Sequence, residues 1–260
     1  MEIDKVVADY LDPQDVREML EQEQDQSLEE LLSVLGELYK EYDKPRSSYF
    51  ALLMADGDNM GAWLGLSGKA KTSEGEVVLR NKPLTECFHR DFSKRLSNYA
   101  LEVQKRAEGE GPFLRLVYAG GDDVLAVGYP INLVKFAVDI RELFSQKVYA
   151  KATLSAGLVI GHEKENLRFL LQEVREAEKL AKKAGRDRLC ISVVTRNSSP
   201  VRVVLRWEDV ALLERLIGYF SKGLLSSNLP YALRVELQNK TLPKQVVSAL
   251  VRRLLLRKKD

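Results

Sequence analysis

The stretch "LVYAGGDDVLAV", residues 116–127, places two glycines and two aspartates at the centre of an otherwise apolar run. The apolar residues on both sides predict two strands, and glycine tolerates the positive φ that a tight hairpin turn imposes. We therefore predict a β-hairpin whose turn is Gly120-Gly121-Asp122, with Asp123 directly after it. An aspartate can serve such a turn simply by bonding its own backbone, so the hairpin alone requires no further role for the carboxylates.

A second acidic loop follows another apolar run. Residues 49–55, "YFALLMA", are typical of a central strand buried on both faces, and this run ends at Asp56 in "DGDNMG". If this strand neighbours the hairpin, Asp56, Asp122 and Asp123 come together, and their repulsion raises their pKa values unless a cation neutralises them. Because carboxylate oxygens are hard ligands, we predict that these three residues bind Mg²⁺ or Mn²⁺ and are the catalytic residues.

Residues around the acidic loops are candidates for binding a nucleotide. The loop that follows the first strand leads into a short helix, so its backbone N–H groups would form a cradle for phosphates. Asp58 is either a further ligand or a cap of the helix entered at Asn59. A cation such as Lys182 in "EKLAKKAGRDR" either reaches a phosphate or is solvated at a helix C-terminus, where the dipole favours it. The predicted nucleotide-binding residues are Gly57, Asp58, Asn59, Gly61, Gly120, Gly121, Lys182 and Arg186.

Around the two loops, the chain alternates between strand and helix patterns. Apolar residues recur at helical spacing in three segments, and two further apolar runs predict strands. The order is strand, helix, hairpin, helix, strand, helix, strand, which indicates an α/β (α+β) fold close to the split βαβ, ferredoxin-like plan, with helices packed on a mixed sheet. The segment at 67–82, rich in Gly, Ser and Lys, is predicted as an exposed loop. The predicted helices are 84–106, 131–146 and 166–184, and the further strands are 153–161 and 188–195.

Changes in pattern divide the chain into three predicted parts. Residues 1–46 form an N-terminal helical segment with two charged helices, 47–206 form the α/β domain, and 207–260 form a C-terminal helical domain. Pro45 marks the first boundary because it disfavours helix for the residue before it. In the last part, helices are expected on either side of a loop that contains "SSNLP".

Composition narrows the classes of protein that the chain can belong to. The 260 residues are 45% hydrophobic and carry a formal charge of only +2, so no global field indicates a nucleic-acid or membrane surface. Two distant cysteines support neither a disulfide framework nor a zinc site. Since no apolar stretch has the length of a signal peptide or membrane span, we expect a cytoplasmic protein without a membrane partner.

The chemistry that fits these residues is two-metal phosphoryl transfer. One cation would activate an attacking 3′-hydroxyl and the other would stabilise the leaving pyrophosphate. The protein needs only to position the reactants and to supply charge.

Four motifs, taken in order, carry a resemblance to a known family. "YFALLMADGDNMG", "LVYAGGDDVLAVGYP", "TLSAGLVIGHEKENL" and "EKLAKKAGRDR" resemble the second palm domain of the large polymerase-like subunit of type III CRISPR effector complexes, most closely the Cmr branch. The match covers about residues 47–206. The resemblance implies a nucleotide-cyclase-like palm that converts ATP into cyclic oligoadenylate, with metal bound by Asp56, Asp122 and Asp123 and with Lys182 near the triphosphate.

The resemblance also implies partners. These are other subunits of the effector complex, guide RNA and target RNA, together with a second palm, in the same complex or in a homodimer, that binds the second ATP. The family's HD nuclease domain, first palm and zinc-binding insertion are not visible in this sequence.

The sequence is compatible with three alternatives. One is a diguanylate-cyclase-like enzyme that acts on GTP, although the motif reads GGDDV rather than GGDEF. Another is a stand-alone palm that makes a cyclic dinucleotide from ATP or GTP as a homodimer. The third is a non-catalytic scaffold that binds RNA and other subunits, for which the intact acidic residues in both loops would have no purpose.

Overall fold

The structure is a computed structural model of the chain. It describes residues 48–72, 75–80, 83–195, 199–237 and 243–256. The predicted N-terminal helical segment at 1–46 lies outside the described residues. The chain divides into two compact units, the second of which begins at Arg206; the three-part division in the sequence stays a prediction.

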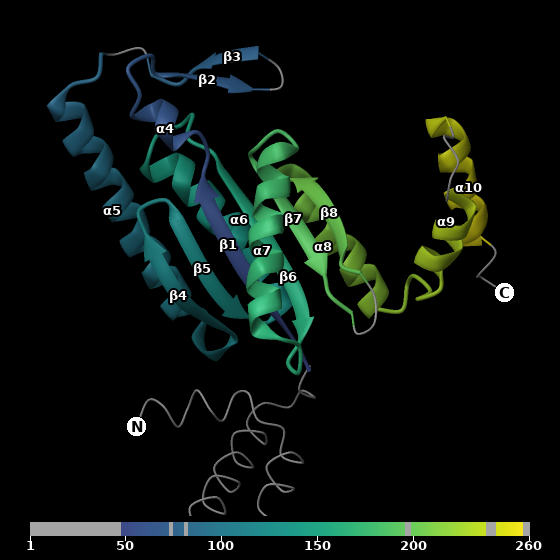
Figure 1. Ribbon diagram of the computed structural model, residues 1–260. Coiled ribbons are helices and arrows are strands. Elements are labelled where there is room, and N and C mark those ends of the chain that lie inside the picture. The colour runs from purple at the N-terminus through teal and green to yellow at the C-terminus, as the bar shows by residue number, and fades with distance from the viewer. Residues whose placement is uncertain (1–47, 73–74, 81–82, 196–198, 238–242, 257–260) are drawn as a thin grey trace, which may run out of the picture. The chain divides into compact units, whose positions relative to one another are not determined.

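The first unit is built around a mixed sheet of six strands (Figure 1). The strand order is β4-β5-β1-β6-β7-β8, in which β1 pairs antiparallel with both β5 and β6, and β7 joins β6 in parallel. The strands are β1 (Tyr49–Gly57), β4 (Leu114–Gly120), β5 (Asp123–Gly128), β6 (Leu154–His162), β7 (Arg188–Val193) and β8 (Val201–Arg206). The helices are α4 (Met60–Trp63), α5 (Glu86–Gly109), α6 (Pro130–Lys147) and α7 (Leu167–Lys183).

The succession β1-α5-β4-β5-α6-β6, with β1 between β5 and β6, is the ferredoxin-like arrangement. The predicted α/β class and the ferredoxin-like palm sheet are therefore confirmed. Strand β8 was not predicted, because arginines interrupt its apolar residues and it lacks a long continuous apolar run.

Successive side chains of a strand point to opposite faces of the sheet, and different helices pack on each face. On one face, Leu52 of β1 packs with Leu170 and Val174 of α7. On the other, the Cα of Gly57 faces Phe144 of α6, whose ring meets Tyr99 of α5 at 4.9 Å. Helix α7 thus covers one face, while α5 and α6 cover the other (Figure 1). Because both faces are covered, the central strands are apolar throughout, and each fully buried large side chain contributes about 1.5–3 kcal/mol.

One segment that was predicted as a loop contains two short strands. The segment predicted as an exposed loop at 67–82 holds a hairpin of β2 (Lys69–Thr72) and β3 (Gly75–Val78). Each strand has only four residues and contains polar side chains, so the sequence shows no clear strand periodicity in this segment. Arg80 fixes the base of this hairpin by donating to the carbonyl oxygens of Gly65 and Trp63.

The second unit contains α8 (Trp207–Ser221), α9 (Leu229–Leu237) and α10 (Lys244–Leu256). Helix α9 begins inside the predicted "SSNLP" loop, because Pro230 occupies the first turn of the helix, where its missing N–H costs nothing. Within the described residues, no helix combines the length and the apolar character that crossing a bilayer requires.

Candidate functional site

Asp56 and Asp123 face each other across neighbouring strands. β1 and β5 pair antiparallel with Ala55 opposite Val124, so the next position along each strand sets Asp56 opposite Asp123. Opposed residues of an antiparallel pair project from the same face of the sheet. Since Asp56 lies an even number of residues from Leu52, this is the face that α7 covers.

Asp122 belongs to the turn rather than to a strand. Gly120 pairs with Asp123, which leaves Gly121 and Asp122 as a two-residue turn, one position later than predicted. Gly121 has a φ of 70°, and Asp122 is not among the described residues with positive φ. This matches a type II′ turn, which takes glycine at its first central position. Because Asp122 stands outside the ladder, the strand alternation does not turn its carboxylate away from that of Asp123.

Gly57 permits the close approach of the two acidic loops. A Cβ atom on Gly57 would lie 2.9 Å from Asp122 Cβ and 3.0 Å from Phe144 Cζ. No side chain fits at this position without displacing the hairpin. Gly57 therefore has a packing role in addition to its predicted place in a phosphate cradle.

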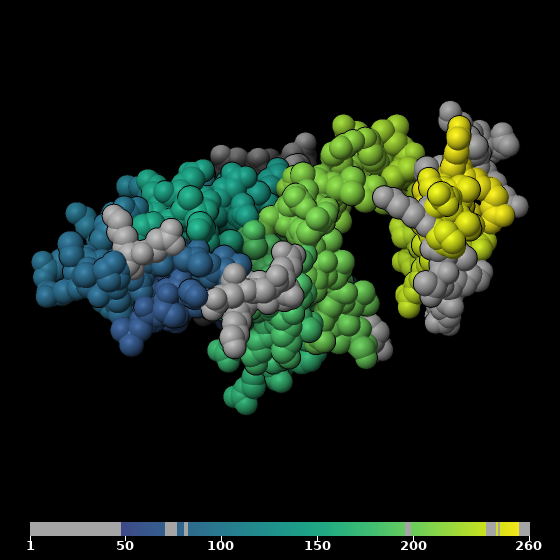
Figure 2. Space-filling view, turned by 90° about the horizontal axis from the view of Figure 1, so that it is seen from above, coloured from purple at the N-terminus to yellow at the C-terminus, as the bar shows by residue number. Residues whose placement is uncertain are grey.

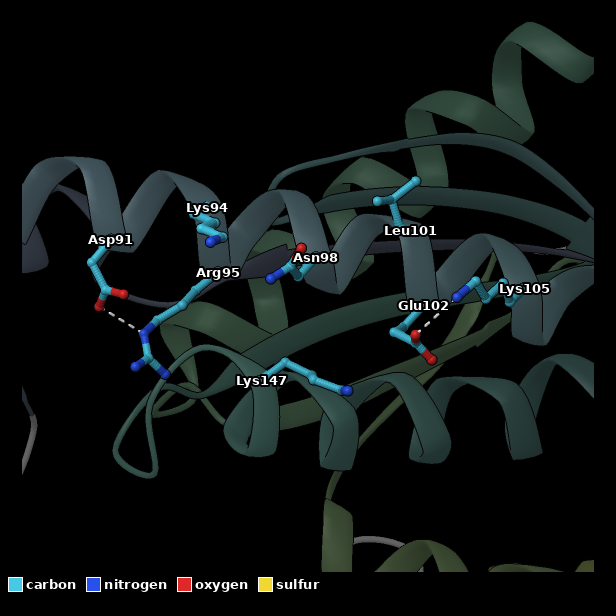
Figure 3. A pocket seen from close by; sticks show the side chains of 8 residues that line it. All are labelled: Asp91, Lys94, Arg95, Asn98, Leu101, Glu102, Lys105 and Lys147. Carbon is cyan, nitrogen blue, oxygen red and sulfur yellow. Dashed lines mark hydrogen bonds and ion pairs between the residues drawn. The ribbon is translucent and has the colours of Figure 1, made fainter.

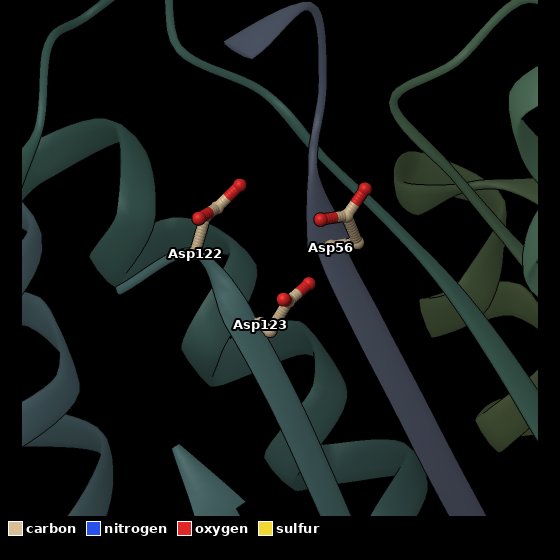
Figure 4. A group of neighbouring side chains, drawn as sticks. All are labelled: Asp56, Asp122 and Asp123. Carbon is tan, nitrogen blue, oxygen red and sulfur yellow. The ribbon is translucent and has the colours of Figure 1, made fainter. Parts of the chain in front are cut away.

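The three carboxylates form one cluster at the edge of the sheet where β1 ends (Figure 4), the edge seen from above in Figure 2. One oxygen from each of Asp56, Asp122 and Asp123 lies within 4.8 Å of the others. Burial raises the pKa of Asp122 and of Asp123, and the charge of Asp123 raises that of Asp122 further. A cluster of this kind fits a hard divalent cation, which would supply the missing positive charge.

Lys182 contacts one carboxylate of this cluster. Its ammonium group forms an ion pair with Asp56 and a second ion pair, at 2.8 Å, with Glu178 one helical turn earlier. Burial lowers the pKa of Lys182, and the nearby charge of Arg186 lowers it further. Burial raises the pKa of Glu178, with the charges of Asp58 and Asp123 adding to the effect. Lys182 was predicted; Glu178 was missed, although its i, i+4 spacing from Lys182 is visible in the sequence.

A glycine in β6 lets α7 carry these side chains to the cluster. A Cβ on Gly157 would lie 2.5 Å from the backbone oxygen of Val174 and 2.5 Å from the backbone nitrogen of Glu178. Because both atoms belong to the helix backbone, they cannot move aside independently. Helix and sheet are therefore in backbone contact at Gly157, one turn before Lys182.

Asp58 is not one of the three clustered carboxylates, and the alternative that it caps a helix is wrong. Its role as a nucleotide-binding ligand stays a prediction. Its side chain is 1% exposed, and its two oxygens accept hydrogen bonds from Thr153, Ser155 and the backbone N–H of Asp187. Helix α4 instead begins after Asn59, which has a φ of 58° and makes no side-chain cap. The physical reason is that the β1–β6 ladder extends to Gly57, opposite Leu154. Asp58 is the next residue, and its carboxylate therefore meets the hydroxyls of Thr153 and Ser155 on either side of Leu154.

The other predicted nucleotide-binding residues lie on the two acidic loops or directly after α7. Gly61 is open, with no atom within 4 Å of an added Cβ, whereas at Gly120 such an atom would meet the ring of Tyr118. Arg186 follows the C-terminus of α7 with a φ of 64°. Their contacts with a nucleotide stay predictions.

The described surface also has a groove away from the carboxylate cluster. A groove of about 450 Å³ is lined by residues of α5 and by Lys147 at the end of α6 (Figure 3). Its charges are largely paired within the wall, as in Arg95 with Asp91 and Lys105 with Glu102. None of the predicted site residues lines it, so the chemistry of the carboxylates, rather than the depth of a cavity, identifies the candidate site.

Comparison with known proteins points to one family. A family model described as Cas10/Cmr2, second palm domain, matches residues 49–190. The CRISPR system Cmr subunit Cmr2 of Pyrococcus furiosus is 30% identical over an alignment of 206 residues, and the match covers 71% of this chain and 23% of that protein. The chain thus spans less than a quarter of the length of this curated relative.

Solved structures share the fold. A type III-B Cmr-beta complex in the apo state matches with a TM-score of 0.61 and 12% identity, covering 86% of this chain and 35% of that chain. A Csm1–Csm4 cassette in complex with cA4 matches with a TM-score of 0.54 and 18% identity, covering 78% of this chain and 31% of that chain.

Proposed function

Because the chain belongs to the Cas10/Cmr2 family through its second palm domain, we propose that it is a metal-dependent nucleotidyltransferase that converts ATP into cyclic oligoadenylate in type III CRISPR antiviral defence. The observation that carries this proposal is the cluster of Asp56, Asp122 and Asp123, whose oxygens lie within 4.8 Å of one another. Nucleotidyl transfer requires positioning and charge stabilisation rather than covalent work by the protein. A cluster of three carboxylates at a sheet edge can meet both needs.

The geometry supports a proposed role for each of these residues. The three aspartates would hold two Mg²⁺ or Mn²⁺ ions, which when bound lower the pKa of an attacking 3′-hydroxyl and neutralise the leaving pyrophosphate. Lys182 neutralises part of the cluster through its ion pair with Asp56, and Glu178 keeps its ammonium group there. When a triphosphate arrives, the flexible stem of Lys182 allows its ammonium to pair with a phosphate as a point charge.

ATP is the proposed substrate because the related Csm1–Csm4 cassette is described in complex with cA4. The proposed partners are further subunits of a type III effector complex, guide RNA and target RNA, in line with the Csm1–Csm4 and Cmr-beta assemblies among the structural relatives. The chain supplies one nucleotide site. A second palm, from a larger partner or from a second copy, would supply the other.

The test is product analysis on the purified chain. The chain is incubated with ATP, and separately with GTP, in the presence of Mg²⁺ or Mn²⁺, and nucleotide binding is measured in parallel. The matched control is the Asp122→Asn/Asp123→Asn variant, which keeps the shape of the hairpin and removes two charges. We expect cation-dependent ATP binding and a cyclic adenylate product, both lost in the control.

Other outcomes separate the alternatives. ATP binding without product would show that a second palm from another chain is indispensable, while a cyclic dinucleotide would identify a stand-alone homodimer. A preference for GTP would favour the diguanylate-cyclase-like alternative. A folded chain that binds neither metal nor nucleotide would overturn the proposal in favour of a scaffold.

A further inference from the structure

The turn that follows α7 has an unusual backbone. The helix closes with a Schellman motif, in which the Gly185 N–H donates to the oxygen of Lys182 and the Arg186 N–H donates to that of Ala181. Gly185 has the positive φ of 126° that this motif requires. The two residues after Gly185 also have positive φ.

Two further residues continue in the left-handed region. Arg186 has a φ of 64° and Asp187 a φ of 48°, and neither is glycine. Residues other than glycine rarely adopt this backbone conformation, and two consecutive examples persist only where the surrounding contacts impose them. The contacts of the turn, here defined as Gly185–Asp187, identify those surroundings.

The first contact is with the buried carboxylate of Asp58. The backbone N–H of Asp187 donates to Asp58 Oδ2 at 3.0 Å. Thr153 Oγ1 donates to the same oxygen at 2.8 Å, and Ser155 Oγ donates to Asp58 Oδ1 at 2.7 Å. Asp58 therefore joins the end of β1, the start of β6 and the turn.

The second contact ties the turn to α6. Arg141 donates through Nε to Asp187 Oδ1 at 3.0 Å and through a terminal nitrogen to Asp187 Oδ2 at 2.7 Å. A bidentate pair of this kind fixes orientation as well as distance. The backbone of Asp187 is thus held from one side by Asp58 and its side chain from the other by Arg141.

We propose that Asp58 and Arg141 are positioning residues that lock the turn for nucleotide binding. The locked turn keeps Arg186 at the end of α7, where its backbone N–H donates to the oxygen of Ala181, the residue before Lys182. Arg186 and Lys182 then present two cations to the triphosphate of a nucleotide at the carboxylate cluster. This inference rests on the proposed function, and it assigns to Asp58 an indirect role in place of direct ligation.

Two variants test the lock from its two ends. Asp58→Asn removes the charge and replaces one of the two acceptor oxygens by an NH₂ group, which only donates, so the three donors that meet Asp58 must share one acceptor oxygen. Asp187→Asn keeps a residue that tolerates positive φ but removes the charge that pairs with Arg141. The control is Arg90→Gln, which removes an ion pair to Glu86 between side chains that are 81% and 86% exposed.

The measurement is the affinity of the full chain for ATP with Mn²⁺, beside its affinity for Mn²⁺ alone. We expect ATP binding to weaken about tenfold in each lock variant, the change that loss of one charged hydrogen bond corresponds to. Binding of Mn²⁺ alone should stay within about twofold of wild type, and Arg90→Gln should change neither affinity. If Asp58 and Asp187 had only a structural role, the variants would lower the affinity for ATP and the affinity for Mn²⁺ alone to a similar extent.

A double-mutant cycle shows whether Asp58 acts through Arg186. In an Arg186→Ala background, Asp58→Asn should weaken ATP binding by less than about twofold, because coupled residues are not additive. A second measurement needs no nucleotide. The exchange rate of the Asp187 amide hydrogen should rise in Asp58→Asn, because this N–H donates to Asp58 in the wild type. If Asp58→Asn fails to unfold cooperatively, Asp187→Asn carries the same cycle.

The outcomes distinguish this inference from the proposed function. A wild-type chain that binds Mn²⁺ but not ATP overturns the proposed function and the positioning role together. If the wild type binds ATP and both lock variants bind it equally well, or if their effects add fully to that of Arg186→Ala, only the positioning role is overturned.

Discussion

At the scale of single residues, Gly57 and Asp122 touch where the end of β1 meets the tip of the β4–β5 hairpin. The contact leaves no room for a side chain on Gly57, since an added Cβ would come within 3.0 Å of both Asp122 and Phe144. Four residues further along, Gly61 faces open space. The two glycines of "DGDNMG" therefore offer a matched comparison.

We expect Gly57→Ala to destabilise the chain by about 1–3 kcal/mol, the usual result of overpacking, and to weaken Mn²⁺ binding because the hairpin must move away from Asp56. Gly61→Ala should change neither property. Urea unfolding and Mn²⁺ titration measure the two effects. Equal behaviour of the two variants would contradict the packing role of Gly57.

The same loop shows why residue-level prediction has a limit. Asp56 and Asp58 lie two residues apart in one acidic loop, so strand alternation alone would place both side chains on the same face of the sheet. In the structure, Asp56 pairs with Lys182 at the cluster, whereas Asp58 is buried under Thr153 and Ser155. The separation depends on where the β1–β6 ladder stops, which is a property of the sheet.

At the scale of elements, α7 is tied to the far edge of the sheet as well as to the candidate site. Glu173 of α7 is 4% exposed and accepts hydrogen bonds from Ser192 of β7 and, through both oxygens, from Arg202 of β8. Hydrogen bonding from Arg202 holds the pKa of Glu173 below its ordinary value of about 4.5. One ionised side chain thus links three elements.

This link predicts a pH-dependent contribution to stability. Because the folded pKa is depressed, the stabilisation is present above the ordinary pKa of glutamate and is lost as pH falls through the lower, folded value. We expect Glu173→Gln to cost about 2 kcal/mol at pH 7, the scale of a hydrogen bond to a charged group, and progressively less as the pH falls below 4.

Urea unfolding of wild type and variant across this pH range measures the difference between them. Glu176→Gln, which removes an exposed i, i+3 pair with Lys179, is the control and should show a much smaller pH dependence, because solvent screens this pair. A difference between wild type and Glu173→Gln that stays constant with pH would rule out ionisation of Glu173 as the source.

At the scale of the whole molecule, the chain consists of two compact units, and the carboxylate cluster, Lys182 and the turn after α7 all belong to the first. A ligand that binds only the folded first unit stabilises that unit by mass action, by about 2.7 kcal/mol at a concentration of 100 times its Kd. The second unit should gain nothing directly.

We therefore expect ATP with Mn²⁺ to raise one unfolding transition by about 5–10 °C, the shift that this free energy produces in a unit of roughly 150–250 residues. The transition of the second unit should stay in place. Scanning calorimetry with and without ligand measures both. Movement of both transitions, or a shift that persists in Asp122→Asn/Asp123→Asn, would contradict a site confined to the first unit.

Much of this fold was determined by local pattern. Continuous apolar runs marked β1 and β6, helical spacing marked α5, α6 and α7, and paired glycines marked the hairpin, because each of these signals is a property of consecutive residues. Short or polar elements such as β2, β3 and β8 escaped, since their few residues carry no distinctive period. The resemblance of four motifs to a type III CRISPR palm was likewise readable in the sequence, and the match to the Cas10/Cmr2 second palm domain confirms it.

What only the tertiary structure decided is which polar side chains meet. The sequence by itself nominated Asp56, Asp122, Asp123 and Lys182 as one set, but the antiparallel register of β1 and β5 places the aspartates together, and the contact of α7 with Gly157 brings Lys182 to them. Burial of Asp58 and its bond to the turn after α7 had no local signal at all. Register, helix approach and burial arise from contacts between residues far apart in the chain, and for that reason they belong to the folded molecule and not to any stretch of its sequence.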